Sequence, residues 1–234
     1  MWKLACVALV VVAAVFVHAG VVAAERAKLF DPKKAISYAP GNPDGDTTGF
    51  VVADGQGNIV SVIQSLFNGF GSGVVPPGTG FCLQNRGRHF TVEPGHPSVF
   101  APGKRPFHTL MASITTRDDR AMMGFATMGG NGQAMFHVQV LTNVFDYGLD
   151  IQEAIERPRF LIGAFLPDEP ADLIRLESRV PAPVFAALKR RGHGIEAAAE
   201  LWYRVGHAHG VTVSSDGVYA GGADPRGDGV ALGF

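Results

Sequence analysis

Runs of apolar residues bounded by glycine and aspartate divide much of the chain into short predicted strands. Gly49–Asp54 and Ile59–Leu66 form one pair, and the intervening Gly55-Gln56-Gly57-Asn58 has hairpin chemistry because glycine accepts positive φ. Leu110–Arg117 and Ala121–Thr127 predict a second pair, which turns at two aspartates. Both connections are short enough for each pair to fold back on itself.

The hydrophobic period changes to that of a helix after the second pair. Met135, Val138, Leu141 and Phe145 fall on one stripe and predict a helix whose apolar face they form. Asn131 can cap its N-terminus through the side-chain oxygen. The later segments predict helices over Ile151–Glu156 and Pro183–Arg191, and strands over Arg175–Val180, Gly210–Ser214 and Val218–Ala220.

Composition is that of a globular domain with a sizeable core, since 47% of the 234 residues are hydrophobic. The formal net charge of −1 and the absence of a Lys/Arg cluster argue against nucleic acid as a partner. The 30 glycines gather in clusters without a period, which predicts sharp turns and close backbone approaches.

The first 24 residues form a separate segment. Lys3 precedes the uncharged run Leu4–Ala24, whose small residues before Glu25 fit a signal-peptidase cleavage site. We therefore predict a signal peptide and a periplasmic or secreted protein. An uncleaved run of this length could instead anchor the chain in a membrane. A third alternative is that residues 1–24 result from the choice of start codon, in which case the protein is cytoplasmic.

The chemistry-bearing stretch begins at Thr47-Thr48, between a Pro/Gly/Asp-rich approach and a predicted strand. A threonine hydroxyl is a nucleophile only when a base takes its proton. Cleavage of the Asp46–Thr47 bond would supply that base as a free α-amine, whose ordinary pKa is about 8. The alternative is an ordinary turn that leads into a strand.

Two further features can complete such a site. Ser65, near the end of its predicted strand, can lie close to Thr47 if the two strands pair antiparallel. Gly129-Gly130, between a strand and a helix start, leaves backbone N–H groups available to negative charge. Glycine could also be needed there for steric reasons alone.

Four other segments leave alternatives open. The glycine-rich loop Phe67–Gly80 and the basic Gln84–Phe90 are long enough to be functional, or form a plain surface excursion. His207-Ala208-His209 could place two imidazoles on one strand face, but no cysteine or carboxylate at metal spacing accompanies them. Arg226-Gly227-Asp228 matches an adhesion tripeptide, and a C-terminal turn explains it better.

Eight motifs occur in a fixed order between about Arg26 and Phe234: Thr47-Thr48, Gly55-x-Gly57-Asn58, Phe70-Gly71-Ser72-Gly73, Lys104-Arg105-Pro106, Gly129-Gly130, Asp146-Tyr147-Gly148, Arg157-Pro158-Arg159-Phe160 and Ala223-Asp224-Pro225-Arg226. In this order they resemble the small subunit of a γ-glutamyltransferase (glutathione hydrolase). The order over some two hundred residues is more specific than any single motif.

The resemblance implies an α+β fold, the αββα sandwich of N-terminal-nucleophile hydrolases, of which residues 47–234 would be the catalytic small-subunit part. It implies autocleavage between Asp46 and Thr47, with Thr47 then attacking an amide carbonyl and its own α-amine acting as base. Ser65 would support the nucleophile, and Gly129 and Gly130 would form the oxyanion hole. The family uses no cofactor and no metal, and its substrates are small-molecule amides or peptides.

Three positions depart from the pattern of the glutathione-handling members. Phe67 replaces an asparagine, His89 replaces the acidic residue for the substrate amine, and His108-Thr109 replace paired serines. These changes resemble the divergent branch that contains cephalosporin-acylase-like proteins. We expect the substrate-binding positions Arg86, His89, His108 and Thr109 to favour glutaryl or other dicarboxylic acyl groups, with Arg86 as candidate for the carboxylate.

The resemblance also implies a partner. The family's large subunit precedes its threonine, whereas residues 25–46 are the only resembling residues before Thr47. A separate polypeptide would supply the large subunit, or the chain is truncated. The alternative function is an inactive or partner-dependent fragment that acts only as a binding protein.

Overall fold

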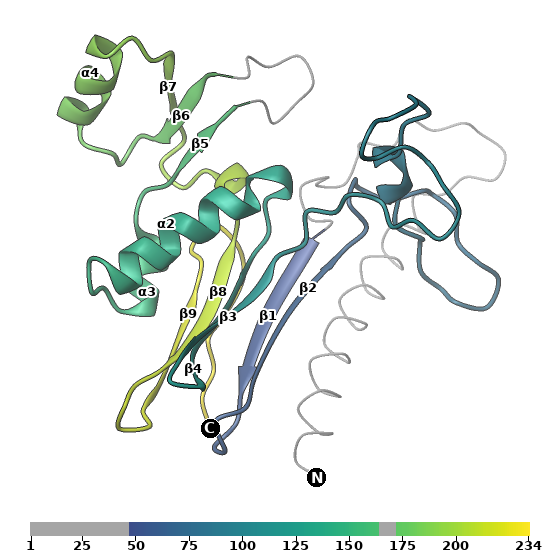
Figure 1. Ribbon diagram of the computed structural model, residues 1–234. Coiled ribbons are helices and arrows are strands. Elements are labelled where there is room, and N and C mark those ends of the chain that lie inside the picture. The colour runs from purple at the N-terminus through teal and green to yellow at the C-terminus, as the bar shows by residue number, and fades with distance from the viewer. Residues whose placement is uncertain (1–46, 164–171) are drawn as a thin grey trace, which may run out of the picture. The chain divides into compact units, whose positions relative to one another are not determined.

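The computed structural model describes residues 47–163 and 172–234 (Figure 1). Its first element is the predicted hairpin, in which β1 (Thr47–Ala53) pairs antiparallel with β2 (Ile59–Ser65). Gly57 takes φ 85° in the turn, a conformation that favours glycine. The register places Thr47 directly opposite Ser65, which confirms the expected proximity of these two positions.

A four-stranded antiparallel sheet stands against this hairpin. Its order is β3-β4-β8-β9, formed by Ala112–Arg117, Arg120–Thr127, Ala208–Val213 and Tyr219–Ala223. The sheets approach closely, because a Cβ on Gly124 of β4 would lie 2.3 Å from Cγ2 of Ile59. A larger residue at position 124 would therefore push the two sheets apart.

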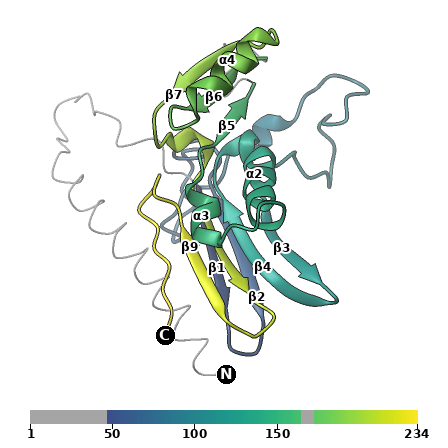
Figure 2. The same ribbon diagram turned by 90° about the vertical axis from the view of Figure 1, so that its left-hand side faces the viewer.

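Two helices cover the other face of the four-stranded sheet: α2 (Gln133–Phe145) and α3 (Ile151–Glu156) (Figures 1 and 2). The described residues thus form three layers in the order helix, sheet, sheet, which confirms the α+β class. In the described part of the chain, no helix covers the outer face of β1–β2.

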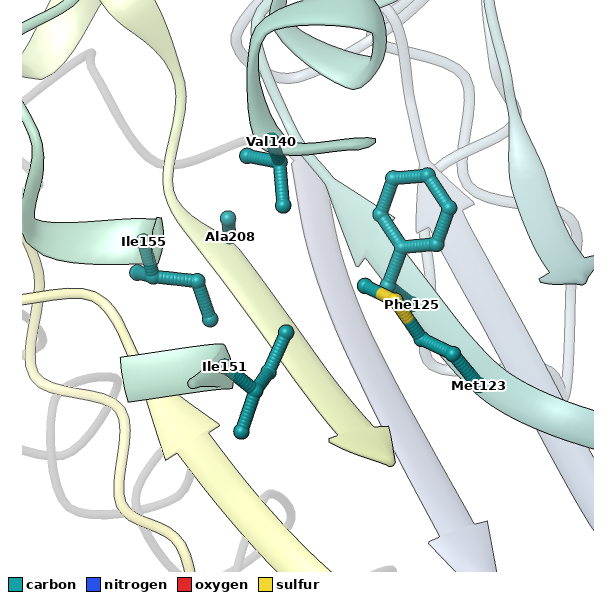
Figure 3. Close-up of a cluster of buried hydrophobic side chains, with 6 residues drawn as sticks. All are labelled: Met123, Phe125, Val140, Ile151, Ile155 and Ala208. Carbon is teal, nitrogen blue, oxygen red and sulfur yellow. The ribbon is translucent and has the colours of Figure 1, made fainter. Parts of the chain in front are cut away.

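The main hydrophobic core lies between the four-stranded sheet and the helices (Figure 3). Side chains from β4, β8, α2 and α3 meet there: Met123, Phe125, Ala208, Val140, Ile151 and Ile155. Full burial of a large aliphatic or aromatic side chain stabilises the fold by about 1.5–3 kcal/mol. This core fixes the end of β4, from which the Gly129-Gly130 turn departs.

The predicted stripe of α2 is wrong in part. Met135 and Leu141 pack against core clusters, but Val138 is 61% exposed and Phe145 is 44% exposed. The polar residue His137 occupies a buried position on the sheet-facing side, which a hydrophobic pattern cannot detect. The expected Asn131 cap is also wrong. The N-cap residue of α2 is Gly132, and the helix has no side-chain capping hydrogen bond.

A small third sheet extends the fold. It contains β5 (Phe160–Ile162), β6 (Ile174–Glu177) and β7 (Ile195–Ala198), and α4 (Ala182–Arg190) connects the parallel pair β6 and β7. Sequence patterns missed β5 and β7, since strands of three or four residues are too short to show alternation. Short 3₁₀ turns η1 (Arg86–His89), η2 (Gly130–Gly132) and η3 (Tyr203–Val205) complete the described elements.

Four buried charges tie β6 to the C-terminal segment. Arg159 donates to Asp224 at 2.6 Å, and Arg226 donates to Glu177 at 2.6 Å and to Asp224 at 2.9 Å. Burial by itself would raise the pKa of Asp224, but the two arginines lower it below its ordinary value. Removing one partner would leave an uncompensated buried charge, which costs about 3–5 kcal/mol. Because Arg226 is buried here, the adhesion-tripeptide alternative is contradicted.

The predicted leader and the segment 25–46 lie outside the described residues. Within residues 47–163 and 172–234, none of the helices is long and apolar enough to cross a membrane.

Candidate active site

The hairpin register brings two hydroxyl groups together. Thr47 begins β1, Ser65 ends β2, and Thr47 Oγ1 donates a hydrogen bond to Ser65 Oγ at 2.8 Å. The backbone N–H of Phe67 donates to the same Ser65 oxygen at 2.9 Å. Phe67 takes φ 79°, a region that a bulky residue rarely adopts, so the chain turns sharply directly after Ser65. The hydrogen bond to Ser65 therefore ties the Thr47 hydroxyl to the end of β2.

The strand-to-helix turn after β4 requires glycine. Gly129 has φ 132° and Gly130 has φ 53°, both in the region that favours glycine. A Cβ on Gly129 would also lie 2.5 Å from Cε2 of Phe136 in α2. At Gly130, by contrast, a Cβ would meet no atom within 4 Å. Crowding against Phe136 thus explains why position 129 is glycine. Position 130 faces open space, so crowding does not explain its glycine.

These features line one cavity of about 280 Å³. Five of the eight candidate catalytic and substrate-binding residues contribute to its lining: Thr47, Ser65, Thr109, Gly129 and Gly130. The remaining lining is mostly apolar or amide in character: Phe67, Asn68, Gly69, Met128, Asn131, Gly132, Met135, Leu161, Ile162 and Tyr203, together with Arg204. A hydroxyl beside a glycine turn in a partly apolar cavity can hold an acyl group next to a nucleophile.

Arg86 lies behind the cavity lining. Its side chain is buried, with only 5% of the residue exposed, and Nη1 donates to Thr109 Oγ1 at 3.1 Å. The guanidinium carbon lies 5.0 Å from the centre of the Phe67 ring, a cation–π contact. Arg86 therefore touches two lining residues without lining the cavity.

His89 also packs behind Phe67. Its ring centre lies 4.6 Å from that of Phe67 and 5.5 Å from that of Phe107. Burial lowers the pKa of His89, and the nearby arginine charges lower it further, so the neutral imidazole is favoured. His108 is exposed and does not line the cavity.

The sequence did not point to Tyr203 and Arg204, which form part of the cavity wall. They lie in η3, and the buried ion network holds both sides of this turn. Arg159 Nη1 donates to the carbonyl oxygens of Val205 at 3.1 Å and of Gly206 at 2.8 Å. In the sequence, the only sign of a role for these two residues was that an aromatic and a basic residue stand together in a predicted loop. Loops often carry functional residues.

A second cavity of about 410 Å³ shares Thr47 and contains both His207 and His209. The imidazoles pack on the C-terminal segment, where a Cβ on Gly229 would lie 2.1 Å from Cε1 of His209. Among the described residues, no group of three His, Cys, Asp or Glu side chains is arranged to hold a metal ion.

Comparison with known proteins gives consistent results. Residues 17–234 match the sequence model of the family described as gamma-glutamyltranspeptidase. An oxamate amidohydrolase proenzyme from Klebsiella pneumoniae subsp. pneumoniae is 38% identical over 204 residues, which are 87% of this chain and 38% of that protein. The chain thus spans well under half the length of this relative.

Solved structures agree. A cephalosporin acylase from Bacillus halodurans has a TM-score of 0.71 at 38% identity, covering 88% of this chain and 37% of that one. A gamma-glutamyltranspeptidase from Pseudomonas nitroreducens, complexed with L-DON, has a TM-score of 0.67 at 30% identity, covering 80% of this chain and 99% of that one. The expected family and its N-terminal-nucleophile hydrolase fold are confirmed, and the chain belongs to the gamma-glutamyltranspeptidase family.

Proposed function

We propose that this protein cleaves or transfers acyl groups of small amides through Thr47, after autocleavage between Asp46 and Thr47. The observation that carries the proposal is the Thr47–Ser65 hydroxyl pair at 2.8 Å in one cavity with Gly129 and Gly130. Two comparisons support it. The Klebsiella relative is a proenzyme. The match to the P. nitroreducens structure covers 99% of the length of that solved chain.

In the cleavage step, Thr47 Oγ1 attacks the carbonyl carbon of Asp46, and the peptide bond is exchanged for an ester. Water then hydrolyses the ester, which frees the α-amine of Thr47 and the carboxylate of Asp46. Ser65 supports this step because its oxygen accepts the Thr47 hydroxyl hydrogen and so orients the nucleophile.

In the catalytic cycle, the α-amine takes the proton of Thr47 Oγ1 as the oxygen attacks the substrate amide. The N–H groups of Gly129 and Gly130 stabilise the oxyanion, and one such donor contributes about 2.7–4 kcal/mol in hydrolases. The tetrahedral intermediate expels the amine, which receives the proton from the Thr47 ammonium. Water or an acceptor amine then takes the acyl group from Thr47.

The proposed acyl group is a dicarboxylic one rather than γ-glutamyl. Phe67 stands in the cavity wall, and Phe67 and His89 pack on each other where glutathione-handling members place polar contacts. None of the described lining residues carries a carboxylate that would pair with a γ-glutamyl amine. Thr109 can donate or accept a hydrogen bond inside the cavity, and Arg86 positions it. His108 would contact only a part of the substrate that extends beyond the cavity.

We further propose a large-subunit partner, because the chain spans 38% of the Klebsiella proenzyme. The outer face of β1–β2, which no described helix covers, is where such a partner would add its layer. If the leader is cleaved, the assembly is periplasmic or secreted. An inactive fragment that serves as a binding protein is the alternative function.

The test is N-terminal sequencing of the full chain, expressed alone and together with the large-subunit region of the Klebsiella proenzyme. The smaller cleavage product should begin Thr-Thr-Gly-Phe. Thr47→Ala should remain uncut because it lacks the attacking oxygen, whereas the matched control Thr48→Ala should be cut at the same bond. Intact wild-type protein under both conditions would contradict the proposal and favour the inactive fragment.

A further inference from the structure

Hydrogen bonds join the turn after β2 to the 3₁₀ turn η1. The backbone N–H of Asn85 donates to the carbonyl oxygen of Leu66 at 3.1 Å, and the N–H of Asn68 donates to Asn85 Oδ1 at 3.2 Å. Arg88 Nη1 donates to Asn68 Oδ1 at 3.1 Å. These bonds hold Asn68, which lines the cavity beside Thr47, against a basic segment.

The bond from Arg88 determines which end of the Asn68 amide is engaged. A guanidinium only donates hydrogen bonds, so the atom next to it must be the amide oxygen rather than the amide nitrogen. Within the described residues, the Nδ2 group of Asn68 has no acceptor. Asn68 therefore presents two N–H donors at the wall of the cavity.

The charge around this amide favours an acceptor that is negative. The segment Gln84–Phe90 contains two arginines and no acidic residue. Arg88 is exposed, and no carboxylate of the described residues pairs with it. Its guanidinium polarises the Asn68 amide through Oδ1, which strengthens the Nδ2 group as a donor.

The distance between this amide and the nucleophile suits a short acyl chain. Asn68 follows Ser65 by three residues, which span at most about 10–11 Å. Phe67 lies between them with φ 79°, so the chain turns sharply and the separation is shorter than this limit. An acyl chain of a few methylene groups would also contact the apolar part of the wall: Met128, Met135, Leu161 and Ile162.

We propose that Asn68, oriented by Arg88, binds the free carboxylate of the acyl group, so that the substrates are monoamides of small dicarboxylic acids. This inference rests on the proposed function, because it places the scissile carbonyl at Thr47. A carboxylate oxygen accepts from Nδ2, and the Arg88 charge lies on the other side of the same amide. Arg86 does not line the cavity and is not the carboxylate ligand in this arrangement.

The same arrangement selects against other acyl groups. A neutral acyl chain gains the apolar contact but leaves the Asn68 donors to water. An acyl chain that ends in an ammonium group has only donors to offer to Nδ2, and the Arg88 charge repels it, which supplies specificity by exclusion. The expected order of turnover is therefore glutaryl, then valeryl, then 5-aminovaleryl.

The experiment compares kcat/KM of the cleaved protein for the glutaryl, valeryl and 5-aminovaleryl p-nitroanilides. Asn68→Ala should lower the glutaryl-to-valeryl ratio about tenfold, mainly through the KM for the glutaryl compound, because a hydrogen bond to a charged group is lost. Asn68→Asp should lower this ratio further and raise the 5-aminovaleryl-to-valeryl ratio, because the new carboxylate repels one ligand and attracts the other. An unchanged glutaryl-to-valeryl ratio in both variants would overturn the proposal.

Matched variants separate the charge from the position. Gln56→Glu makes the same amide-to-carboxylate change at an exposed position outside the cavity and should leave both ratios unchanged. Arg88→Gln can still donate to the Asn68 oxygen, so it should retain more of the glutaryl-to-valeryl ratio than Arg88→Met. Equal ratios in the two Arg88 variants would overturn the orienting role of Arg88.

A binding measurement separates this inference from the proposed function. Titration calorimetry of the full chain with glutaramate, the anionic monoamide, and with neutral valeramide needs no turnover. The wild-type chain should bind glutaramate at least about tenfold more tightly than Asn68→Asp does, whereas valeramide affinity should be equal in both and so show that the variant is folded. Failure of cleavage together with this preference would contradict the proposed function and support the Asn68 site. Equal affinity of the wild-type chain for the two amides would overturn the site.

Discussion

At the scale of single residues, the site depends on how the ends of the first two strands meet. The alternation of Ile59–Leu66 was sufficient to place Ser65 near Thr47, because a hairpin with a short turn has only one register. Arg204 could not be found in this way. The position of its turn depends on Arg159, which donates to the Val205 carbonyl, and on Glu177, which accepts from the Trp202 N–H. Both are distant in the sequence, and no local pattern encodes such contacts.

Ser65→Ala should slow both autocleavage at Asp46–Thr47 and amide turnover by about 10- to 100-fold. A hydrogen bond lost from a reacting group typically costs about 1–3 kcal/mol, and Ser65 Oγ also accepts from the N–H of Phe67. The rates are measured by gel densitometry of the precursor and by anilide release.

The matched control is Ser61→Ala on the same strand. Ser61 Oγ donates to the carbonyl oxygen of Phe125 and is remote from the cavity lining, so its loss should reduce stability by about 1 kcal/mol and leave cleavage intact. Equal rates in Ser65→Ala and wild type would show that Ser65 has no role in the reaction.

At the scale of elements, long strands with clear alternation were predictable and short or polar-faced elements were not. The β1–β2 and β3–β4 pairs match the pattern, whereas β5 and β7 are too short to show one. Helix α2 was found, but its buried face was misjudged because Gln133 and His137 occupy interior positions. A hydrophobic pattern does not reveal a buried polar side chain that has a specific partner.

His137 gives α2 a pH-dependent contact with the sheet. Its ring packs 4.4 Å from that of Phe125, Nδ1 lies 3.1 Å from Ser113 Oγ, and burial lowers the pKa of His137 to about 4. The unfolded chain binds a proton at about pH 6.5. The free energy of unfolding should therefore fall as the pH decreases from 6.5 toward 4, by on the order of 3 kcal/mol for this residue.

The pH dependence of the free energy of unfolding is measured by urea denaturation of wild type and His137→Gln between pH 7 and 4.5. Burial also lowers the pKa of His89, His207 and His209, so the difference between wild type and variant isolates His137. The variant should be less sensitive to acid, whereas His193→Gln at an exposed position should follow wild type. Identical pH slopes in wild type and His137→Gln would contradict the assignment.

At the scale of the whole molecule, the described layers expose an apolar surface. The hairpin buries one face on β4 and β8 and leaves Phe50 and Val60 on the other, where they are 37% and 53% exposed. An exposed apolar sheet face with unpaired edges promotes association. Family membership and the hairpin pairs β1–β2, β3–β4 and β8–β9 were predictable from the sequence. The pairing of β4 with β8 and the layer that covers the outer face of β1–β2 were not.

The chain expressed alone should self-associate, as measured by sedimentation velocity, and co-expression with a large-subunit region should reduce this. Val60→Lys should weaken self-association because it places a charge on the outer face of β2. Val218→Lys, at a similarly exposed turn between β8 and β9, should have little effect. A monodisperse wild-type monomer would show that the exposed outer face of β1–β2 does not cause association and needs no partner layer.

Detection of the acyl-enzyme shows most directly whether Thr47 is the nucleophile. Cleaved protein is mixed with the glutaryl anilide, quenched in acid within the first turnovers, digested and examined by mass spectrometry. The peptide beginning Thr-Thr-Gly-Phe should carry the mass of one glutaryl group on Thr47. Anilide release with the acyl group on another residue, or continued turnover by Thr47→Ala, would contradict the assignment of Thr47 as the nucleophile.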